Sequence, residues 1–258
     1  MSLMTDHSEI DKNAKIGTNV TFGFGVRVYG NVEIGDDCKI GDFCVIGHPT
    51  SHSKTPPLSI GAGSVVRSHS VIYEGSKIER GLETGHHVVI REGAQIGENL
   101  RIGNFSDIEG ACQIGDFVRM HGYAHVGRGA KIGDFVWLFS LTTLMNDPLP
   151  PSHLHEPVSI RDMATVCVNA QLMPGADVGR GAMIASGATA KGLIPPGALI
   201  AGPEGEIAGS VRFLMHMESR TRHPWHLHFG DAYPERARAR ISALGASIDA
   251  EISNLQNG

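Results

Sequence analysis

The strongest constraint on this chain is an apolar residue, usually aliphatic, that returns at every sixth position. Three runs keep this period, from Ile10 to Ile46, from Ile60 to Leu144 and from Ile160 to Ala190, and only Thr84 is clearly polar among the in-phase positions. One apolar side chain in a six-residue unit cannot be buried by that unit alone, so it must stack on the units above and below. The period therefore predicts an all-β parallel β-helix built from hexapeptide repeats.

The composition agrees with tightly turning repeats, because 33 of the 258 residues are Gly and only 6% are aromatic. Gly often follows the in-phase residue, as in "IGD", where it permits a tight turn and close backbone approach. The net charge of -5 gives no reason to expect a nucleic-acid partner. No apolar run reaches membrane-spanning length and no signal region is recognisable, so we expect a cytoplasmic protein without membrane contact.

The period is interrupted twice and then ends. We predict loops at 47–59 and 145–159, where the in-phase residues are missing. After Gly202 the period is lost, and apolar residues recur at helical spacing from Ile241 to Leu255. We therefore expect a β-helix domain at 4–202 and a C-terminal extension at 203–258, with a helix at about 235–255.

The repeats carry a family resemblance. The segments "VIREGAQIGENLRIGNFSDIEGACQIGDFVRM" and "PGADVGRGAMIASGATAKGLIPPGALIAG" resemble the hexapeptide acyltransferases, and the likeness covers roughly Ile10 to Ala201. The resemblance implies a left-handed β-helix, a homotrimer, and acyl-CoA bound along the groove between two subunits. A loop from a middle coil covers that groove in the family, and the predicted loop at 145–159 has the corresponding length and place.

The start of this loop distinguishes two subgroups of the family. Hexapeptide sugar O-acetyltransferases carry a catalytic His before Pro here, whereas this chain has Asn146-Asp147-Pro148. That sequence, with "TGHHVVIREG" and "SVIYEGSKI", resembles N-acyltransferases acting on nucleotide-linked amino sugars. The resemblance implies transfer of an acyl group, in the first instance acetyl from acetyl-CoA, to an amine. Leu149 stands where that subgroup has an aromatic residue, which leaves the shape of the sugar pocket open.

The residue types fit amine chemistry. A sugar hydroxyl needs a positioned general base before it can attack a thioester. An amine needs to be present in its neutral form, and a polar or carboxylate side chain can orient it and receive its proton. We therefore predict that Asn146 and Asp147 are catalytic residues that orient the amine or receive its proton. The alternative is that Asn-Asp-Pro only begins a turn.

The segment "MHGYAH" supplies a second candidate base. It resembles the "AHIAH" segment of the acyltransferases of lipid A synthesis. When "AHVGR" is aligned with that segment, His125 matches the first His and Arg128 stands at the position of the second His. His125 is thus a candidate catalytic residue for O-acylation of a sugar. His121 and the loop residues His153 and His155 are candidate substrate contacts. His121 and His125 can equally face solvent or a neighbouring subunit.

The segment "MIASGATAKG" is the candidate CoA site, since it resembles the family segment "IGAGSVVTKD". Small residues such as Ala185 and Ser186 would let pantetheine lie against the backbone, whose N–H groups would hold its amides and the developing oxyanion. Lys191 would meet a CoA phosphate as a point charge. Asn169 would add a polar contact.

Two further classes remain as alternatives, a purely structural β-helix and a metal enzyme. The γ-type carbonic anhydrases share the fold and bind zinc between subunits through three His, of which the second and third are five residues apart. His121 and His125 are four apart, which turns one side chain away. The four cysteines form no CxxC pair, and Pro224 interrupts the histidine-rich segment 223–228. We therefore expect no metal.

Overall fold

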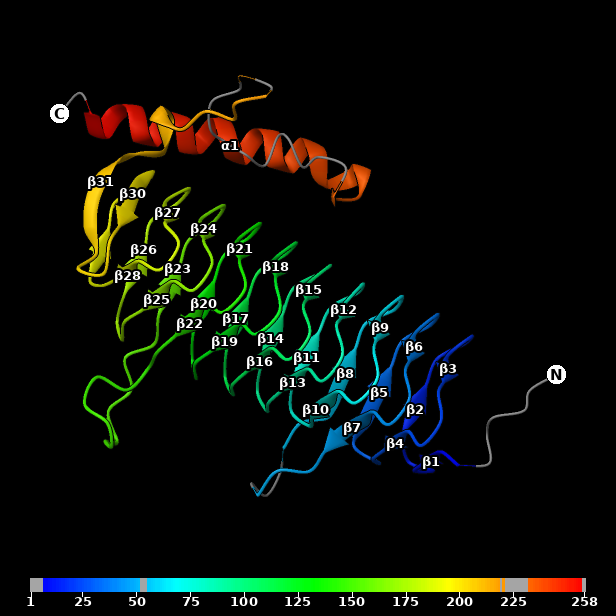
Figure 1. Ribbon diagram of the computed structural model, residues 1–258. Coiled ribbons are helices and arrows are strands. Elements are labelled where there is room, and N and C mark those ends of the chain that lie inside the picture. The colour runs from blue at the N-terminus through cyan, green and yellow to red at the C-terminus, as the bar shows by residue number, and fades with distance from the viewer. Residues whose placement is uncertain (1–6, 52–54, 219, 221–231, 257–258) are drawn as a thin grey trace. The chain divides into compact units, whose positions relative to one another are not determined.

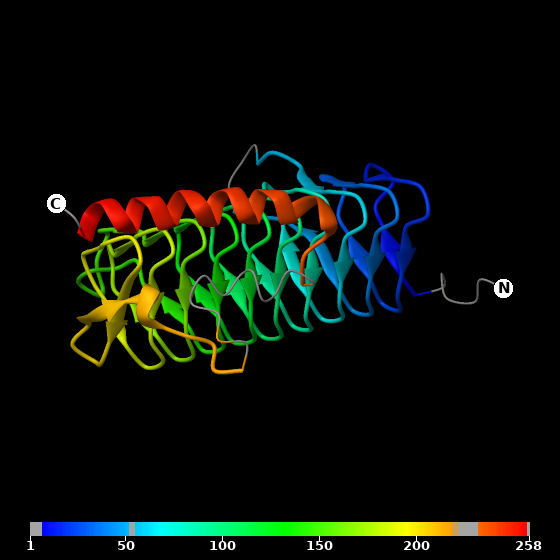
Figure 2. The same ribbon diagram turned by 90° about the horizontal axis from the view of Figure 1, so that it is seen from above.

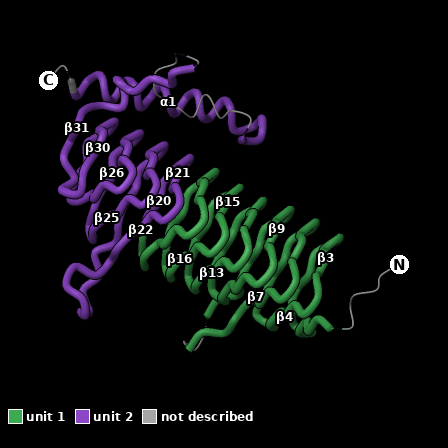
Figure 3. Tube along the Cα trace, viewed as in Figure 1, with its two compact units in different colours: residues 1–130 green, residues 131–258 purple. Residues whose placement is uncertain are grey.

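The computed structural model describes residues 7–51, 55–218, 220 and 232–256. The chain forms two compact units, 1–130 and 131–258 (Figure 3). Within each unit it passes in turn through three parallel sheets, which we name A, B and C, and paired residues in adjacent coils are typically 18 positions apart (Figure 1). The predicted fold class, a left-handed parallel β-helix with a C-terminal helix, is confirmed.

Unit 1 contributes strands to all three sheets. Sheet A holds β1 (Glu9–Ile10), β4 (Arg27–Val28), β7 (Val45–His48), β10 (Val71–Tyr73), β13 (Val89–Ile90), β16 (Asp107–Ile108) and β19 (His125–Val126). Sheet B holds β2 (Lys15–Ile16), β5 (Val32–Ile34), β8 (Leu58–Ile60), β11 (Lys77–Ile78), β14 (Gln95–Ile96) and β17 (Gln113–Ile114). Sheet C holds β3 (Thr21–Phe22), β6 (Lys39–Ile40), β9 (Val65–Val66), β12 (Glu83–Thr84), β15 (Arg101–Ile102) and β18 (Arg119–Met120).

Unit 2 also contributes strands to the three sheets and ends in a different structure. Sheet A holds β22 (Thr143–Leu144), β25 (Gln171–Leu172) and β28 (Thr189–Ala190); sheet B holds β20 (Lys131–Ile132), β23 (Ser159–Ile160), β26 (Asp177–Val178) and β29 (Leu193–Ile194). Sheet C holds β21 (Trp137–Leu138), β24 (Thr165–Val166), β27 (Met183–Ile184), β30 (Ala198–Ala201) and the antiparallel β31 (Glu206–Ser210). A 3-10 helix, Val211–Phe213, and helix α1, Glu235–Gln256, follow.

The in-phase residues form a large part of the core, together with apolar residues such as Leu82 and Leu100 that stand two positions before an in-phase residue. In unit 1, Ile46, Ile72 and Ile90 occupy successive coils of sheet A, and each is fully buried. Full burial of such a side chain contributes about 1.5–3 kcal/mol. The one polar in-phase residue, Thr84, is also fully buried, and its hydroxyl accepts a hydrogen bond from the backbone N–H of Arg67 at 2.9 Å. The polar exception is therefore tolerated because its hydroxyl has a partner.

Glycine after the in-phase residue has the predicted physical reason. At Gly61, a Cβ atom would lie 2.4 Å from the backbone nitrogen of Arg80 in the next coil. No side chain fits between backbones that approach so closely.

One corner of unit 1 carries a ridge of stacked rings, which we call the corner ridge. Its members have φ between +55° and +63° and ring centroids 4.7–5.2 Å apart; they are Phe43, His69, His87, Phe105 and Tyr123. A left-handed conformation costs an L-residue about 1–2 kcal/mol. Each stacked pair offsets part of that cost, by about 0.5–1.5 kcal/mol for aromatic pairs. His69 and His87, which are 18 positions apart in the sequence, form one of the stacked pairs.

The outward side chains of unit 1 differ between sheets. On sheet A, Val45, Val71 and Val89 follow one another in register, and each is half-buried. The equivalent positions of sheet B are polar: Lys15, Glu33, Ser59, Lys77, Gln95 and Gln113. Sheet B thus suits solvent, whereas contiguous apolar side chains on sheet A suit contact with protein or ligand.

Helix α1 packs along the coils of unit 2 through one apolar stripe (Figure 2). Ala237, Ile241, Ile248 and Ile252 are buried on this stripe. Arg180, which follows β26, donates hydrogen bonds to Ser247 at 3.3 Å and to Glu251 at 3.0 Å. The helix is therefore held by both apolar and polar contacts.

Two glycines of unit 2 allow this packing to be tested. Gly197 and Gly192 both have positive φ, +65° and +63°, but a Cβ at Gly197 would lie 2.2 Å from Ile252 Cδ1, whereas one at Gly192 would meet nothing within 4 Å. We expect Gly192→Ala to cost only the backbone strain of about 1–2 kcal/mol. Gly197→Ala should cost more, because the side chain of Ile252 must also move out of its packed position. Chemical denaturation of both variants measures the difference, and equal losses would contradict the packing of Ile252.

Candidate functional site

The clearest chemical pair in unit 1 joins His125 and Asp107. The two residues occupy equivalent positions in β19 and β16, one coil apart, and both side chains point outward from sheet A. Nδ1 of His125 lies 2.8 Å from Oδ2 of Asp107, and the side chains are 38% and 41% exposed. No partner of His125 Nε2 is found within the described residues. If Nδ1 carries the proton toward the carboxylate, Nε2 presents a lone pair outward.

This environment sets the protonation of His125. The hydrogen bond to Asp107 raises the pKa of His125, and the charges of Asp107 and Glu109 raise it further, against the opposing effect of burial. A carboxylate beside an imidazole stabilises the imidazolium form. The pair can therefore take up a proton and hold it, as a general base must.

Asp107 was not among the residues predicted for the site. It stands 18 positions before His125, and a three-sided coil of hexapeptides places residues with that separation side by side. The six-residue period therefore indicates that Asp107 and His125 lie in adjacent coils. It does not show that their side chains touch, because that contact depends on both rotamers.

Arg128 belongs to a separate charged cluster in the same unit. Its backbone N–H donates to Glu109 Oε2 at 2.9 Å, and its guanidinium lies 3.6 Å from the carboxylate of Glu92. Burial raises the pKa of Glu92. A backbone hydrogen bond and the cations Arg91 and Arg128 outweigh this effect and hold the pKa of Glu92 below its ordinary value. Arg128 is therefore engaged in ion pairing rather than placed as a base. His121 is exposed in the turn after β18.

The predicted catalytic pair of unit 2 lies in the loop between β22 and β23. The Asp147 carboxylate accepts three hydrogen bonds, from Leu149 N at 3.0 Å, from Ser152 N at 3.1 Å and from Ser152 Oγ at 2.6 Å. These bonds, led by the one from the Ser152 side chain, lower the pKa of Asp147. Asn146 is placed differently, with Nδ2 3.5 Å from Nδ1 of His155. The exposed side chain of His153 has no hydrogen bond to any described residue.

The candidate CoA residues lie on the last coils of unit 2. Ser186, Lys191 and Asn169 are exposed, and Ala185 is half-buried. The backbone does not behave as expected, because several N–H groups of this segment already donate to carbonyls of the protein. These donors belong to Ala185, Gly187, Ala188 and Thr189. Stacking of coils consumes them, so any contact with CoA in this segment must come from side chains or from other amides.

Among the described residues, no group of three His, Cys, Asp or Glu side chains is placed to hold a metal ion. The histidine-rich segment 223–228 lies outside the described residues. None of the helices that the structure describes is long and apolar enough to span a membrane.

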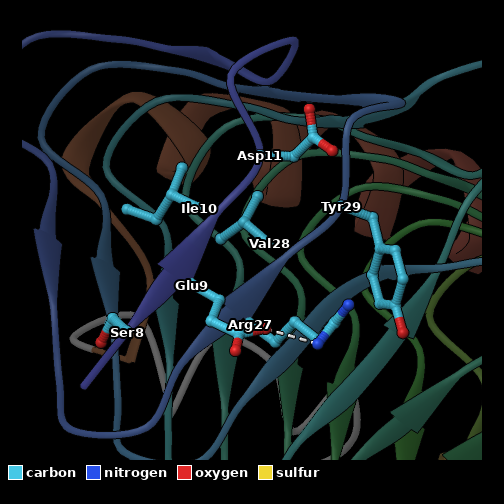
Figure 4. A pocket seen from close by; sticks show the side chains of 7 residues that line it. All are labelled: Ser8, Glu9, Ile10, Asp11, Arg27, Val28 and Tyr29. Carbon is cyan, nitrogen blue, oxygen red and sulfur yellow. Dashed lines mark hydrogen bonds and ion pairs between the residues drawn. The ribbon is translucent and has the colours of Figure 1, made fainter.

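A pocket of about 390 Å³ lies elsewhere in unit 1, at the first strands of sheet A (Figure 4). Glu9 and Arg27 pair across it at 2.5 Å, and the Arg27 guanidinium lies 4.8 Å from the ring centroid of Tyr29. The strands β7, β10 and β13 separate it from the His125–Asp107 pair in sheet order. Its charges are already paired with each other, so we assign it no role in the chemistry.

Comparison with known proteins agrees with this architecture. Residues 8–48 match the family model described as bacterial transferase hexapeptide (six repeats). The chain is similar to the solved UDP-N-acetylglucosamine acyltransferase from Arabidopsis, with a TM-score of 0.62, 20% identity, and coverage of 81% of this chain and 74% of that one. No curated protein matches the sequence.

Two other solved structures are less similar. LpxA from Acinetobacter baumannii has a TM-score of 0.47 at 16% identity, covering 81% of this chain and 74% of that one. A mutant of AntD, an N-acyltransferase from Bacillus cereus solved with dTDP and coenzyme A, has a TM-score of 0.34 at 16% identity, covering 55% and 78%. The predicted resemblance to hexapeptide-repeat acyltransferases is thus confirmed for the repeat and the fold.

Proposed function

We propose that this protein is an acyltransferase that moves an acyl group, in the first instance acetyl, from acyl-CoA to the amine of a nucleotide-linked amino sugar. The observation that carries the proposal is the His125–Asp107 pair, a supported proton acceptor on the outer surface of a hexapeptide coil. The amine nitrogen attacks the thioester carbonyl carbon, His125 Nε2 accepts a proton from that nitrogen, and the C–S bond breaks. The CoA thiolate then leaves and takes up a proton.

The choice of an amine as acceptor is supported by the loop between β22 and β23. Asn146-Asp147-Pro148 occupies the place where the sugar O-acetyltransferases of this repeat class carry a histidine. An amine is a stronger nucleophile than a hydroxyl once it is neutral, so it needs no second histidine beside the thioester.

A sugar hydroxyl is the second candidate acceptor, and the same His125–Asp107 pair favours it. A hydroxyl cannot attack until a base removes its proton, and an imidazole held by a carboxylate is suited to that step. The two candidates thus share the base and differ in the bond that is formed, an amide or an ester.

The test uses nucleotide sugars in matched pairs that differ only by an amino or a hydroxyl group at one carbon. Acetyl-CoA is supplied, and the product is measured by mass spectrometry before and after treatment with hydroxylamine. We expect a product with one acetyl group that survives the treatment, because amides resist hydroxylamine and esters do not. An ester product would select the second candidate, and no transfer to any pair would refute the function.

We also propose that acyl-CoA contacts Asn169, Ala185, Ser186 and Lys191. The exposed ammonium group of Lys191 would meet a CoA phosphate equally in the ground and transition states. Lys191→Ala should therefore raise KM for acetyl-CoA by about 2- to 5-fold, the value of one exposed ion pair, with kcat unchanged. Lys131→Ala, an exposed lysine of unit 2 on sheet B, is the matched control. An unchanged KM would remove Lys191 from the site.

The assembly that we propose is a cytoplasmic homotrimer. It is supported by the apolar column of Val45, Val71 and Val89 and by the corner ridge, both on unit 1 and both repeating at the spacing of the coils. An identical chain with its coils parallel would present the same spacing, which makes it a complementary partner. Since His125 shares sheet A with this column, the neighbouring copy would enclose the reaction.

A further inference from the structure

The loop between β22 and β23 is closed at its base. The backbone N–H of Glu156 donates to the carbonyl of Asn146 at 2.8 Å, and the N–H of Gly175 in the next coil donates to the carbonyl of Glu156 at 2.8 Å. We call this base, Asn146 with His155 and Glu156, the neck. Compact surface loops whose ends meet in this way hold their side chains in place and are frequently functional.

A second set of contacts closes the loop internally, and we call it the clasp. Asp147 Oδ1 accepts from Leu149 N and from Ser152 Oγ, while Oδ2 accepts from Ser152 N. Ser152 Oγ in turn accepts from Leu154 N at 3.1 Å. The clasp therefore determines the path of the chain from Asp147 to Leu154.

These contacts are unfavourable for a proton acceptor. A general base needs a lone pair directed at the substrate and a pKa near the working pH. Three hydrogen bonds are already directed at the Asp147 carboxylate, and they lower its pKa away from neutrality.

The neck offers different chemistry. Asn146 Nδ2 lies 3.5 Å from His155 Nδ1, a separation at the long limit of a hydrogen bond. When Asn146 donates to Nδ1, the proton of a neutral His155 resides on Nε2, which then donates. A donor of this kind suits an oxygen of the acceptor, either a sugar hydroxyl or a phosphate.

We infer that Asp147 is a positioning residue that closes the clasp, and that Asn146 and His155 at the neck are the pair that binds the oxygens of the acceptor sugar nucleotide. This inference deepens the proposed function and rests on it. Proton transfer then belongs to His125, and the loop between β22 and β23 binds the acceptor.

The decisive comparison is between Asp147→Asn and Asp147→Ala in the full-length protein. Asn retains the oxygen that accepts from Leu149 N and Ser152 Oγ and loses only the bond from Ser152 N to the second oxygen. We therefore expect kcat/KM for the acceptor to remain within about 3-fold of wild type, while Ala lowers it by about 10-fold or more, mainly through KM. An amide cannot accept a proton, so a base at this position predicts that Asn is as inactive as Ala. Equal losses in both variants would overturn the inference.

Ser152 gives an independent comparison. Ser152→Ala removes two clasp bonds, the one from Ser152 Oγ to Asp147 and the one from Leu154 N to Ser152 Oγ, and leaves the carboxylate with two backbone donors. A positioning role therefore predicts a higher KM with an unchanged pH profile, and Ser152→Thr should restore the KM. A base role predicts instead that the acidic limb of the pH profile moves to higher pH, since the pKa of Asp147 rises when the bond is lost. That movement would contradict the inference.

Amide hydrogen exchange, measured without substrate, tests the hydrogen bonds of the clasp independently of acyl transfer. Exchange at Leu149 and Ser152 should accelerate in Asp147→Ala, and exchange at Leu149, whose acceptor oxygen is retained, should recover in Asp147→Asn. The matched control is Asp36, whose carboxylate accepts from Thr18 N at 2.6 Å in a turn of unit 1; Asp36→Ala should leave the loop unchanged. If the wild type transfers no acyl group, the proposed function fails. Unchanged exchange in Asp147→Ala would refute the clasp itself, whatever the activity.

Discussion

His125→Ala is expected to lower kcat for acyl transfer by about 100- to 10,000-fold, the contribution of one well-placed general base. The reason is that the amine or hydroxyl would then release its proton to water instead of to a neighbouring imidazole. His125 is exposed enough that its loss should leave the inward core of β19 intact. Single-turnover assays on material with wild-type mass and unfolding midpoint would measure the effect. Full activity in this variant would contradict the assignment.

The pH profile provides a second measure of the same pair. The base form of His125 is neutral, and Asp107 raises the pKa of His125, so activity should be complete above that raised value and should fall as the pH drops through it. Asp107→Asn removes the charge that stabilises the imidazolium. The acidic limb of kcat/KM should therefore move to lower pH, and the plateau should fall because the ring is less well oriented. If the acidic limb does not move in Asp107→Asn, Asp107 does not influence the group whose titration the limb reports.

Val71→Arg is expected to convert the proposed trimer into monomers. Val71 lies outward in the middle of the apolar column, between Val45 and Val89 in register. An unpaired cation enclosed at a protein contact costs about 3–5 kcal/mol. That cost corresponds to a loss of about 100-fold or more in the association constant at each contact. Light scattering and sedimentation at micromolar concentration would report the change in mass.

Gln95→Arg is the matched control for this substitution. Gln95 is also outward on a strand of unit 1, but it belongs to the polar column of sheet B and is exposed. Gln95→Arg should leave the proposed trimer intact and the proposed acyl transfer unchanged. A wild-type protein that is monomeric and active would refute both the assembly and the enclosure of His125 by a second copy.

The repeat and its consequences were determined by the sequence alone. A period of six is a local property, because each unit must direct one side chain inward, and the fully buried Ile46, Ile72 and Ile90 follow from it directly. The C-terminal helix was predictable for the same reason, since the spacing of its apolar residues, including Ile241 and Ile252, is also local. His125 could be selected as a candidate, but its role in the reaction stays a prediction.

Only the tertiary structure decided which polar groups meet. Asp107 reaches His125 because two coils are stacked in register and both side chains turn toward each other. Asp147, selected from the sequence as a catalytic residue, is surrounded by hydrogen-bond donors from its own loop, and the amides expected to bind CoA already serve the adjacent coil. Hydrophobic periodicity specifies a direction for each side chain, whereas a hydrogen bond requires two particular atoms within about 3 Å of each other, so no period along the chain can specify it.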